Sequence, residues 1–169
     1  DETLDEDGDP CEDIKSLQAF IHDGLKTVLN SKDFKVRAVN CCSYGASIVY
    51  IDDTGKNIGA LYNYLKPYPP ELLEQFYNRY GGEITFSMHT ASPVLGSLNS
   101  GMQLYRIKQQ QPELLRNIRH SLHLPQYMSF LVTGRPYSDI TSIGCHTGLW
   151  NFPQNHYHEW LYREGINDK

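Results

Sequence analysis

The stretch TGRPYSDITSIGCHTGL, Thr133 to Leu149, is the most informative part of this chain. An apolar helical segment ends at Thr133-Gly134, and glycine is a common helix terminator. A Ser138-Asp139 step and a loop of small residues follow, and the stretch closes on Thr147-Gly148 and an apolar pair. The segments around this loop decide which α/β fold it belongs to.

Length and composition predict one globular domain. The chain has 169 residues, 40% of them hydrophobic, and contains no apolar run of the roughly 18 residues that a membrane span needs. The net charge is -5, but eight of the 20 acidic residues lie within residues 1–13. We expect this segment to be a solvated acidic linker, and the nearly neutral remainder to bind neither nucleic acid nor membrane.

Two groups of residues resemble metal ligands but lack the spacing of a known site. Asp5, Asp7 and Asp9 alternate, yet the downstream Glu of a calcium loop is missing. The histidines lack a convincing set of companion ligands, so we expect them to be solvated or packed in the core. The four cysteines show neither zinc spacing nor secreted-scaffold density, which predicts reduced thiols and a cytoplasmic protein.

Apolar periodicity predicts alternating helices and strands. Val36–Cys42, with Cys41-Cys42 buried, and Ala46–Ile51 are expected strands, and the turn Asp52–Lys56 closes the second of them. The stretch Leu61–Leu65 is expected to be extended. Helices are expected over residues 14–29, 71–80, 97–110, 112–118 and 123–132, with a short one over 157–163.

The order of these motifs resembles the sugar-binding domain of the FGGY carbohydrate kinases. The stretch from Val36 to Ile58 is similar to a substrate-facing hairpin of that family, whose tip contacts sugar hydroxyls. The resemblance assigns this contact to Ser43, Tyr44, Gly45 and Ser47. A glycine there allows close approach of the backbone to a polyol, and an aromatic ring stacks on its C–H face.

Other parts of the chain fit the same family more loosely. LYNYLKPYP, Leu61–Pro69, resembles a substrate-facing strand and implies that Asn63 and Tyr64 contact the sugar, although Leu65 and Lys66 depart from the family pattern. The loop quoted above adds Ser138, Asp139 and Thr147 to the expected site. The helix after Ser100 resembles the family's signature helix, with Gln103 and Arg106 in place of its Lys and Trp.

The resemblance implies an α/β fold of the ribonuclease H-like, actin-like ATPase superfamily. Residues 14–169 would form an incomplete N-terminal kinase domain with added helices. The parent protein would be a carbohydrate kinase that uses ATP and Mg²⁺ to phosphorylate a pentose, deoxyhexose or related polyol. The expected partners are the sugar and the nucleotide-binding domain of the same protein, with a homodimer as a further assembly to consider.

The family's phosphate-contacting hairpin and its catalytic-base segment have no counterpart in this sequence. We therefore expect no catalytic residue here, no cofactor bound by this piece alone, and no activity from it. Two alternatives stay open. One is a non-catalytic sugar-sensing or scaffold protein derived from the kinase fold, which the replacements at Gln103 and Arg106 favour, and the other is an unrelated α/β domain.

Overall fold

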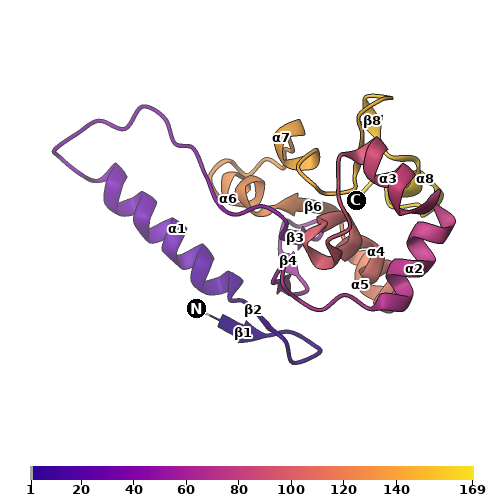
Figure 1. Cartoon of the computed structure of the whole chain (residues 1–169). Coiled ribbons are helices and arrows are strands. Elements are labelled where there is room, and N and C mark those ends of the chain that lie inside the picture. The colour runs from indigo at the N-terminus through magenta and orange to yellow at the C-terminus, as the bar shows by residue number, and fades with distance from the viewer. Residues whose placement is uncertain (1) are drawn as a thin grey trace.

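A three-stranded antiparallel sheet lies at the centre of the molecule. The computed structural model describes residues 2–169. In it, β3 (Ile48–Ile51) pairs with β4 (Asn57–Ile58) on one side and β6 (His120–His123) on the other. Tyr50 lies opposite Ile58, and Val49 lies opposite Leu122. Figure 1 shows helices gathered around this sheet and one long helix, α1, extending away from it.

Strand β3 is buried on both faces. All four of its side chains are at most 1% exposed. Successive strand residues point to opposite faces, so Ile48 and Tyr50 pack into the larger of two cores, and Val49 and Ile51 pack into the smaller. This explains why the strand reads as an unbroken apolar run instead of alternating with polar residues.

The larger core is an aromatic cluster centred on Phe76. This residue lies on α2 (Pro70–Arg79), and its ring meets those of Phe86, Tyr105 and Trp160 edge-on at centroid distances of 5.1, 5.0 and 5.3 Å. These partners come from α3 (Gly82–Thr90), α4 (Ser100–Gln110) and α8 (Glu159–Arg163). Edge-to-face contacts of this kind add to the hydrophobic gain of burial, so the cluster joins three successive helices to α8 near the C-terminus.

Shorter elements complete the body. They are the 3-10 turn η1 (Gly96–Leu98), α5 (Pro112–Asn117), α6 (Leu124–Thr133), α7 (Ile140–Ile143) and the hairpin of β7 (Trp150–Asn151) with β8 (His156–Tyr157).

The acidic segment is folded, and the prediction of a solvated linker is wrong for the residues described. Strands β1 (Glu2–Leu4) and β2 (Pro10–Glu12) form a hairpin, and β2 pairs with β5 (Leu61–Tyr62). Cys11, opposite Tyr62, is only 3% exposed. The hairpin forms because its carboxylates meet cationic side chains that lie about 60 to 100 residues further along the chain. The expected division of the chain at residue 13 stays a prediction.

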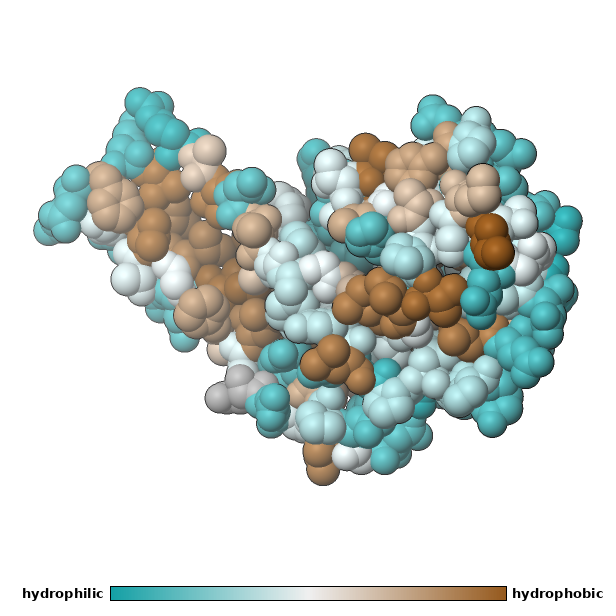
Figure 2. All heavy atoms as spheres, viewed as in Figure 1, coloured by the Kyte–Doolittle hydropathy of each residue, from teal (hydrophilic) through white to brown (hydrophobic). Residues whose placement is uncertain are grey.

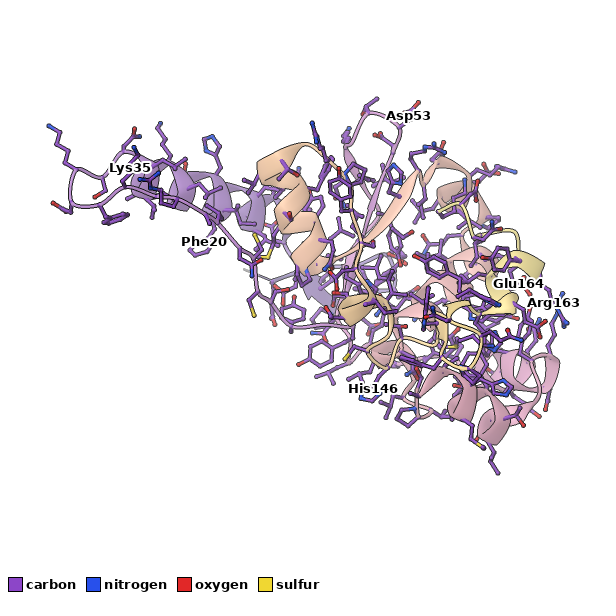
Figure 3. The ribbon with its side chains drawn as sticks, turned by 90° about the horizontal axis from the view of Figure 1, so that it is seen from above. Phe20, Lys35, Asp53, His146, Arg163 and Glu164 are labelled. Carbon is purple, nitrogen blue, oxygen red and sulfur yellow. The ribbon has the colours of Figure 1, made fainter. Side chains whose placement is uncertain are left out.

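Helix α1 (Ile14–Leu29) confirms the helix predicted for residues 14–29. The Asp13 carboxylate caps it by accepting a hydrogen bond from the Lys15 amide at 3.0 Å. Its apolar stripe, however, is not buried by the rest of the described chain, and Phe20 is 75% exposed. Figure 2 shows this stripe as a hydrophobic area over α1, and Figure 3 shows Phe20 and Lys35 on the arm that extends from the body.

Several predicted elements differ from the structure. The expected strand Val36–Cys42 is wrong, because β4 and β6 already occupy both edges of β3 and the segment pairs with no strand among residues 2–169. Cys42 is accordingly exposed. The hairpin that does form is β3–β4, and of Leu61–Leu65 only the first two residues are strand. The elements β6, α3 and α7 were not predicted, and His123 ends a strand instead of starting a helix.

Within residues 2–169, no helix combines the length and the apolar character required to cross a bilayer.

Candidate functional site

The tip before β3 brings two predicted residues together. Tyr44 and Tyr64 lie with their ring centroids 5.8 Å apart and their planes tilted by 54°. Tyr44 precedes β3, and Tyr64 follows β5, so two neighbouring strands position the pair. The Tyr44 side chain stays 41% exposed. The pair therefore presents aromatic surface to a ligand from solvent.

Gln103 fixes the backbone of this tip. Its Nε2 donates to the carbonyl oxygen of Ala46 at 2.6 Å and to that of Ser97 at 2.7 Å. Ala46 has a φ of 65°, in the left-handed region that residues with a side chain rarely adopt. The buried Gln103 side chain holds this conformation from α4. The residue at the position of the family's lysine therefore stabilises the backbone of the tip.

A mainly apolar hollow of about 250 Å³ lies beside the tyrosine pair. Its volume lies just below the range of roughly 300–1,000 Å³ that is usual for ligand pockets. His146, labelled in Figure 3, lies at this hollow and has a φ of 54°, with its Nδ1 3.0 Å from the Ala91 carbonyl oxygen. The lining residues are Tyr44, Gly45, Ala46, Tyr64, Leu98, Cys145 and His146.

A second, polar hollow of about 400 Å³ opens along the same tip. Ser43 lines it together with Ser138 and Asp139, so it unites three predicted residues that are separated by 95 positions in sequence. Asp139 caps α7 by accepting hydrogen bonds from the amides of Thr141 and Ser142 at 2.9 and 3.1 Å. The hydroxyl of Thr141 and these amides hold the pKa of Asp139 below its ordinary value, although partial burial acts against them. The hollow thus offers a carboxylate and hydroxyls to a polar ligand.

The side chains of three other predicted residues form hydrogen bonds within the protein. The Ser47 hydroxyl is fully buried and donates to the Tyr62 carbonyl oxygen at 3.1 Å. Thr147 is 2% exposed and donates its hydroxyl to the carbonyl of Ile143. Asn63 closes a turn by accepting a hydrogen bond from the Leu65 amide at 2.8 Å. Ser47 and Thr147 therefore brace the site from inside.

A buried histidine, His123, lies beneath the site, where the sequence predicted only a solvated or core residue. His123 is 4% exposed, and its Nε2 lies 2.9 Å from the Ser100 hydroxyl oxygen. Burial lowers the pKa of His123 to about 4, with the charge of Asp139 acting weakly in the other direction. The imidazole is thus neutral at neutral pH and joins β6 to the start of α4. No local sequence signal indicates this contact, because it depends on a strand pairing.

The alternating aspartates of the hairpin surround a lysine. Oxygens of Asp5, Asp7 and Asp9 lie 2.5, 3.0 and 2.8 Å from Nζ of Lys66. The three carboxylates are close enough to one another to suit a metal ion, but the ammonium group already supplies the positive charge between them. The cluster is therefore an ion network around a buried ammonium group.

Comparison of the sequence with known proteins gives a consistent set of relatives. No protein-family model matches the chain. The rhamnulokinase of Yersinia pestis (strain Pestoides F) is 26% identical over 151 residues, which are 86% of this chain and 30% of the relative. The rhamnulokinase of Klebsiella pneumoniae (strain 342) is 27% identical over 151 residues, with the same coverage. The chain thus spans about a third of the length of the curated relatives that it matches.

Solved structures agree on the fold. A carbohydrate kinase from Novosphingobium aromaticivorans superposes with a TM-score of 0.81 at 24% identity, over 96% of this chain and 34% of that one. A gluconate kinase from Lactobacillus acidophilus gives a TM-score of 0.76 at 18% identity, over 99% and 34%. These neighbours confirm the predicted α/β fold, which the chain shares with these sugar kinases over the portion that it covers. Taken with the rhamnulokinase matches, they agree with the resemblance drawn from the sequence motifs: over the portion that it covers, this chain is similar to carbohydrate kinases.

Proposed function

We propose that this chain is the sugar-binding portion of an ATP-dependent carbohydrate kinase that phosphorylates a hydroxyl of a pentose, deoxyhexose or related polyol. The observation that carries the proposal is the Tyr44–Tyr64 pair at the small hollow. Aromatic rings stack on the C–H faces of sugars, while the hydroxyls and the carboxylate of the neighbouring polar hollow offer hydrogen bonds to a polyol. The relatives named above support the class of substrate.

The chemical step belongs to other parts of the parent kinase in this proposal. Phosphoryl transfer needs Mg²⁺, the triphosphate and a group that accepts the hydroxyl proton, all held in line with the sugar. We assign ATP, Mg²⁺ and the nucleotide-binding domain to the remainder of that protein. The role of this chain is to orient the acceptor hydroxyl, and the chain alone is expected to be inactive. Its four unpaired cysteines support a reducing, cytoplasmic setting.

The second proposal is a sugar-binding protein without catalysis. This proposal is favoured by the contacts of Gln103 and Arg106, the residues that replace the family's lysine and tryptophan. Gln103 holds the tip, while Arg106 contacts Asp7 of the acidic hairpin at 2.5 Å. Both side chains therefore form hydrogen bonds within the protein, in place of contacts with a substrate.

Steady-state kinetics of the intact parent protein test the first proposal. The panel is rhamnulose, xylulose, gluconate and glycerol, each with saturating ATP and Mg²⁺. Tyr44→Ala and Asn63→Ala are expected to raise the KM for the accepted sugar by roughly tenfold, equivalent to about 1.4 kcal/mol, with the KM for ATP unchanged. Tyr162→Ala is the matched control, because Tyr162 is a half-exposed tyrosine on α8.

Two results would decide against this assignment. An unchanged sugar KM in both tip variants would remove the tip from the binding site. Calorimetric binding of one of the sugars without any ATP consumption would select the non-catalytic protein instead.

A further inference from the structure

The acidic hairpin is joined to the body by a charge network centred on a buried lysine. The Lys66 side chain is 2% exposed and that of Asp5 is 0% exposed. A buried ammonium group is costly unless carboxylates and hydrogen bonds compensate it. Burial alone would lower the pKa of Lys66, but its hydrogen bonds to Asp5, Asp9 and Asp7 raise it above the ordinary value. The hairpin therefore supplies the carboxylates that allow Lys66 to be both buried and charged.

A second cation ties the same hairpin to α4. Nη2 of Arg106 lies 2.5 Å from the Asp7 carboxylate, and Nη1 donates to the Pro67 carbonyl oxygen at 3.0 Å. One oxygen of Asp7 thus lies between the guanidinium of Arg106 and the ammonium of Lys66. The hairpin, the turn after β5 and α4 are fixed relative to one another by these contacts.

This network ends at the tyrosine pair. The Lys66 amide donates to the Asn63 carbonyl oxygen at 3.0 Å, which closes the turn that contains Tyr64. At the other end of the hairpin, Glu12 lies beside Tyr44. Burial raises the pKa of Tyr44 to about 12, and the charge and hydrogen bonding of Glu12 contribute to the rise. The hairpin therefore lies beside Tyr44 through Glu12, and through Lys66 it is tied to the turn that carries Tyr64.

We propose that the acidic hairpin, residues 2–12, is an electrostatic strap, and that Lys66 and Arg106 are positioning residues that hold Tyr64 against Tyr44 at the ligand site. The proposal deepens the proposed function, since the sugar is the ligand that the pair would orient. Three carboxylates of the hairpin, those of Asp5, Asp7 and Asp9, meet Lys66 from the turn and Arg106 from α4. The acidic leader, which the sequence presents as an exposed tail, would thus be part of the binding site's support.

Amide hydrogen exchange on the intact protein tests the strap without any ligand. Lys66→Met removes the charge and keeps most of the stem. In this variant the amides of residues 65 and 66 are expected to exchange at least about tenfold faster. The amides of the β3–β6 ladder should keep their protection. Lys66→Arg should restore protection, and Lys56→Met, at the exposed β3–β4 turn, should change neither region. Asp7→Asn, whose side chain is 48% exposed, provides a milder second variant with the same direction of effect.

Kinetics give the second readout. The strap predicts a higher sugar KM in Lys66→Met and Asp7→Asn with kcat retained, and recovery in Lys66→Arg. Unchanged exchange in residues 61–66 would overturn the proposal. A uniform rise across all amides would also overturn it, because Lys66 would then serve only global stability. Faster exchange limited to the turn, in a protein that binds none of the four sugars, would support the strap and reject the sugar assignment.

Discussion

Replacing Gly101 by alanine tests the packing between α4 and the loop that ends at Leu149. Gly101 is buried near the start of α4, and its amide donates to the Thr147 carbonyl oxygen at 2.9 Å. An added Cβ would lie 2.6 Å from that oxygen, 3.0 Å from Cδ2 of Leu149 and 3.2 Å from Cζ2 of Trp160. The first of these contacts is with backbone, so the helix and the loop must move apart.

The structure sets the size and sign of the effect. Overpacking of a rigid core costs about 1–3 kcal/mol, and weakening the amide hydrogen bond adds about 1 kcal/mol. The better helix propensity of alanine offsets at most about 1 kcal/mol. Gly101→Ala should therefore lower the free energy of unfolding by roughly 1–3 kcal/mol.

Gly24 offers a matched control on α1. Nothing lies within 4 Å of a Cβ placed there. Gly24→Ala should therefore gain helix propensity without a clash and raise stability by up to about 1 kcal/mol. Urea denaturation followed by circular dichroism measures both variants, and their midpoints should separate by roughly 0.3 M or more for an m-value of about 1–3 kcal/mol/M. A midpoint for Gly101→Ala at or above that of the unchanged protein would refute the close contact of α4 with the loop.

Two further changes probe buried charge. Burial lowers the pKa of both His123 and His158 to about 4, so each is neutral in the folded protein and binds a proton more readily once unfolded. The contribution of these histidines to stability is therefore complete above pH 6.5. The free energy of unfolding should fall as the pH drops from 6.5 towards 4, by at most about 1.4 kcal/mol per pH unit for each histidine. In the double variant His123→Gln/His158→Gln, the urea midpoint should depend much less on pH over this range. Glu164→Gln should lower the free energy of unfolding by roughly 3–5 kcal/mol, because its carboxylate is 2% exposed and lies 2.6 Å from Lys108 Nζ. Glu159→Gln, in an exposed pair at the start of α8, should change it by less than about 1 kcal/mol. Equal thermal midpoints for the two variants would contradict the buried pair.

The local elements were predictable because their signals lie within a few residues. Apolar spacing identifies α1, and a proline in the first turn marks α5. The start expected around Pro10 is wrong, because Pro10–Glu12 form β2 and Asp13 caps the helix. The turn Asp52–Lys56 identifies the β3–β4 hairpin, since the Asp52 carboxylate accepts from the amides of Thr54 and Lys56, both at 2.9 Å. Helix propensity and capping act over such short distances, and in these elements the tertiary packing agrees with them.

Strand pairing could not be predicted in the same way. Val36–Cys42 has the composition of a strand, but a strand exists only where a partner offers hydrogen bonds, and both edges of β3 are taken by β4 and β6. His120–His123 has no strand-like alternation and still becomes β6, because it lies against β3. The same limit applies to Ser47 and Thr147, whose inward direction follows from packing.

The sequence by itself determined the family resemblance, the main helices and the polar and aromatic residues of the tip, because order along the chain and local spacing carry that information. Only the tertiary structure decided which of these residues meet. It joined Ser43 to Asp139 in one hollow and Tyr44 to Tyr64 at another. It also turned an apparent acidic tail into a folded hairpin, because the buried charge of Lys66 can be compensated only by carboxylates that approach it through space.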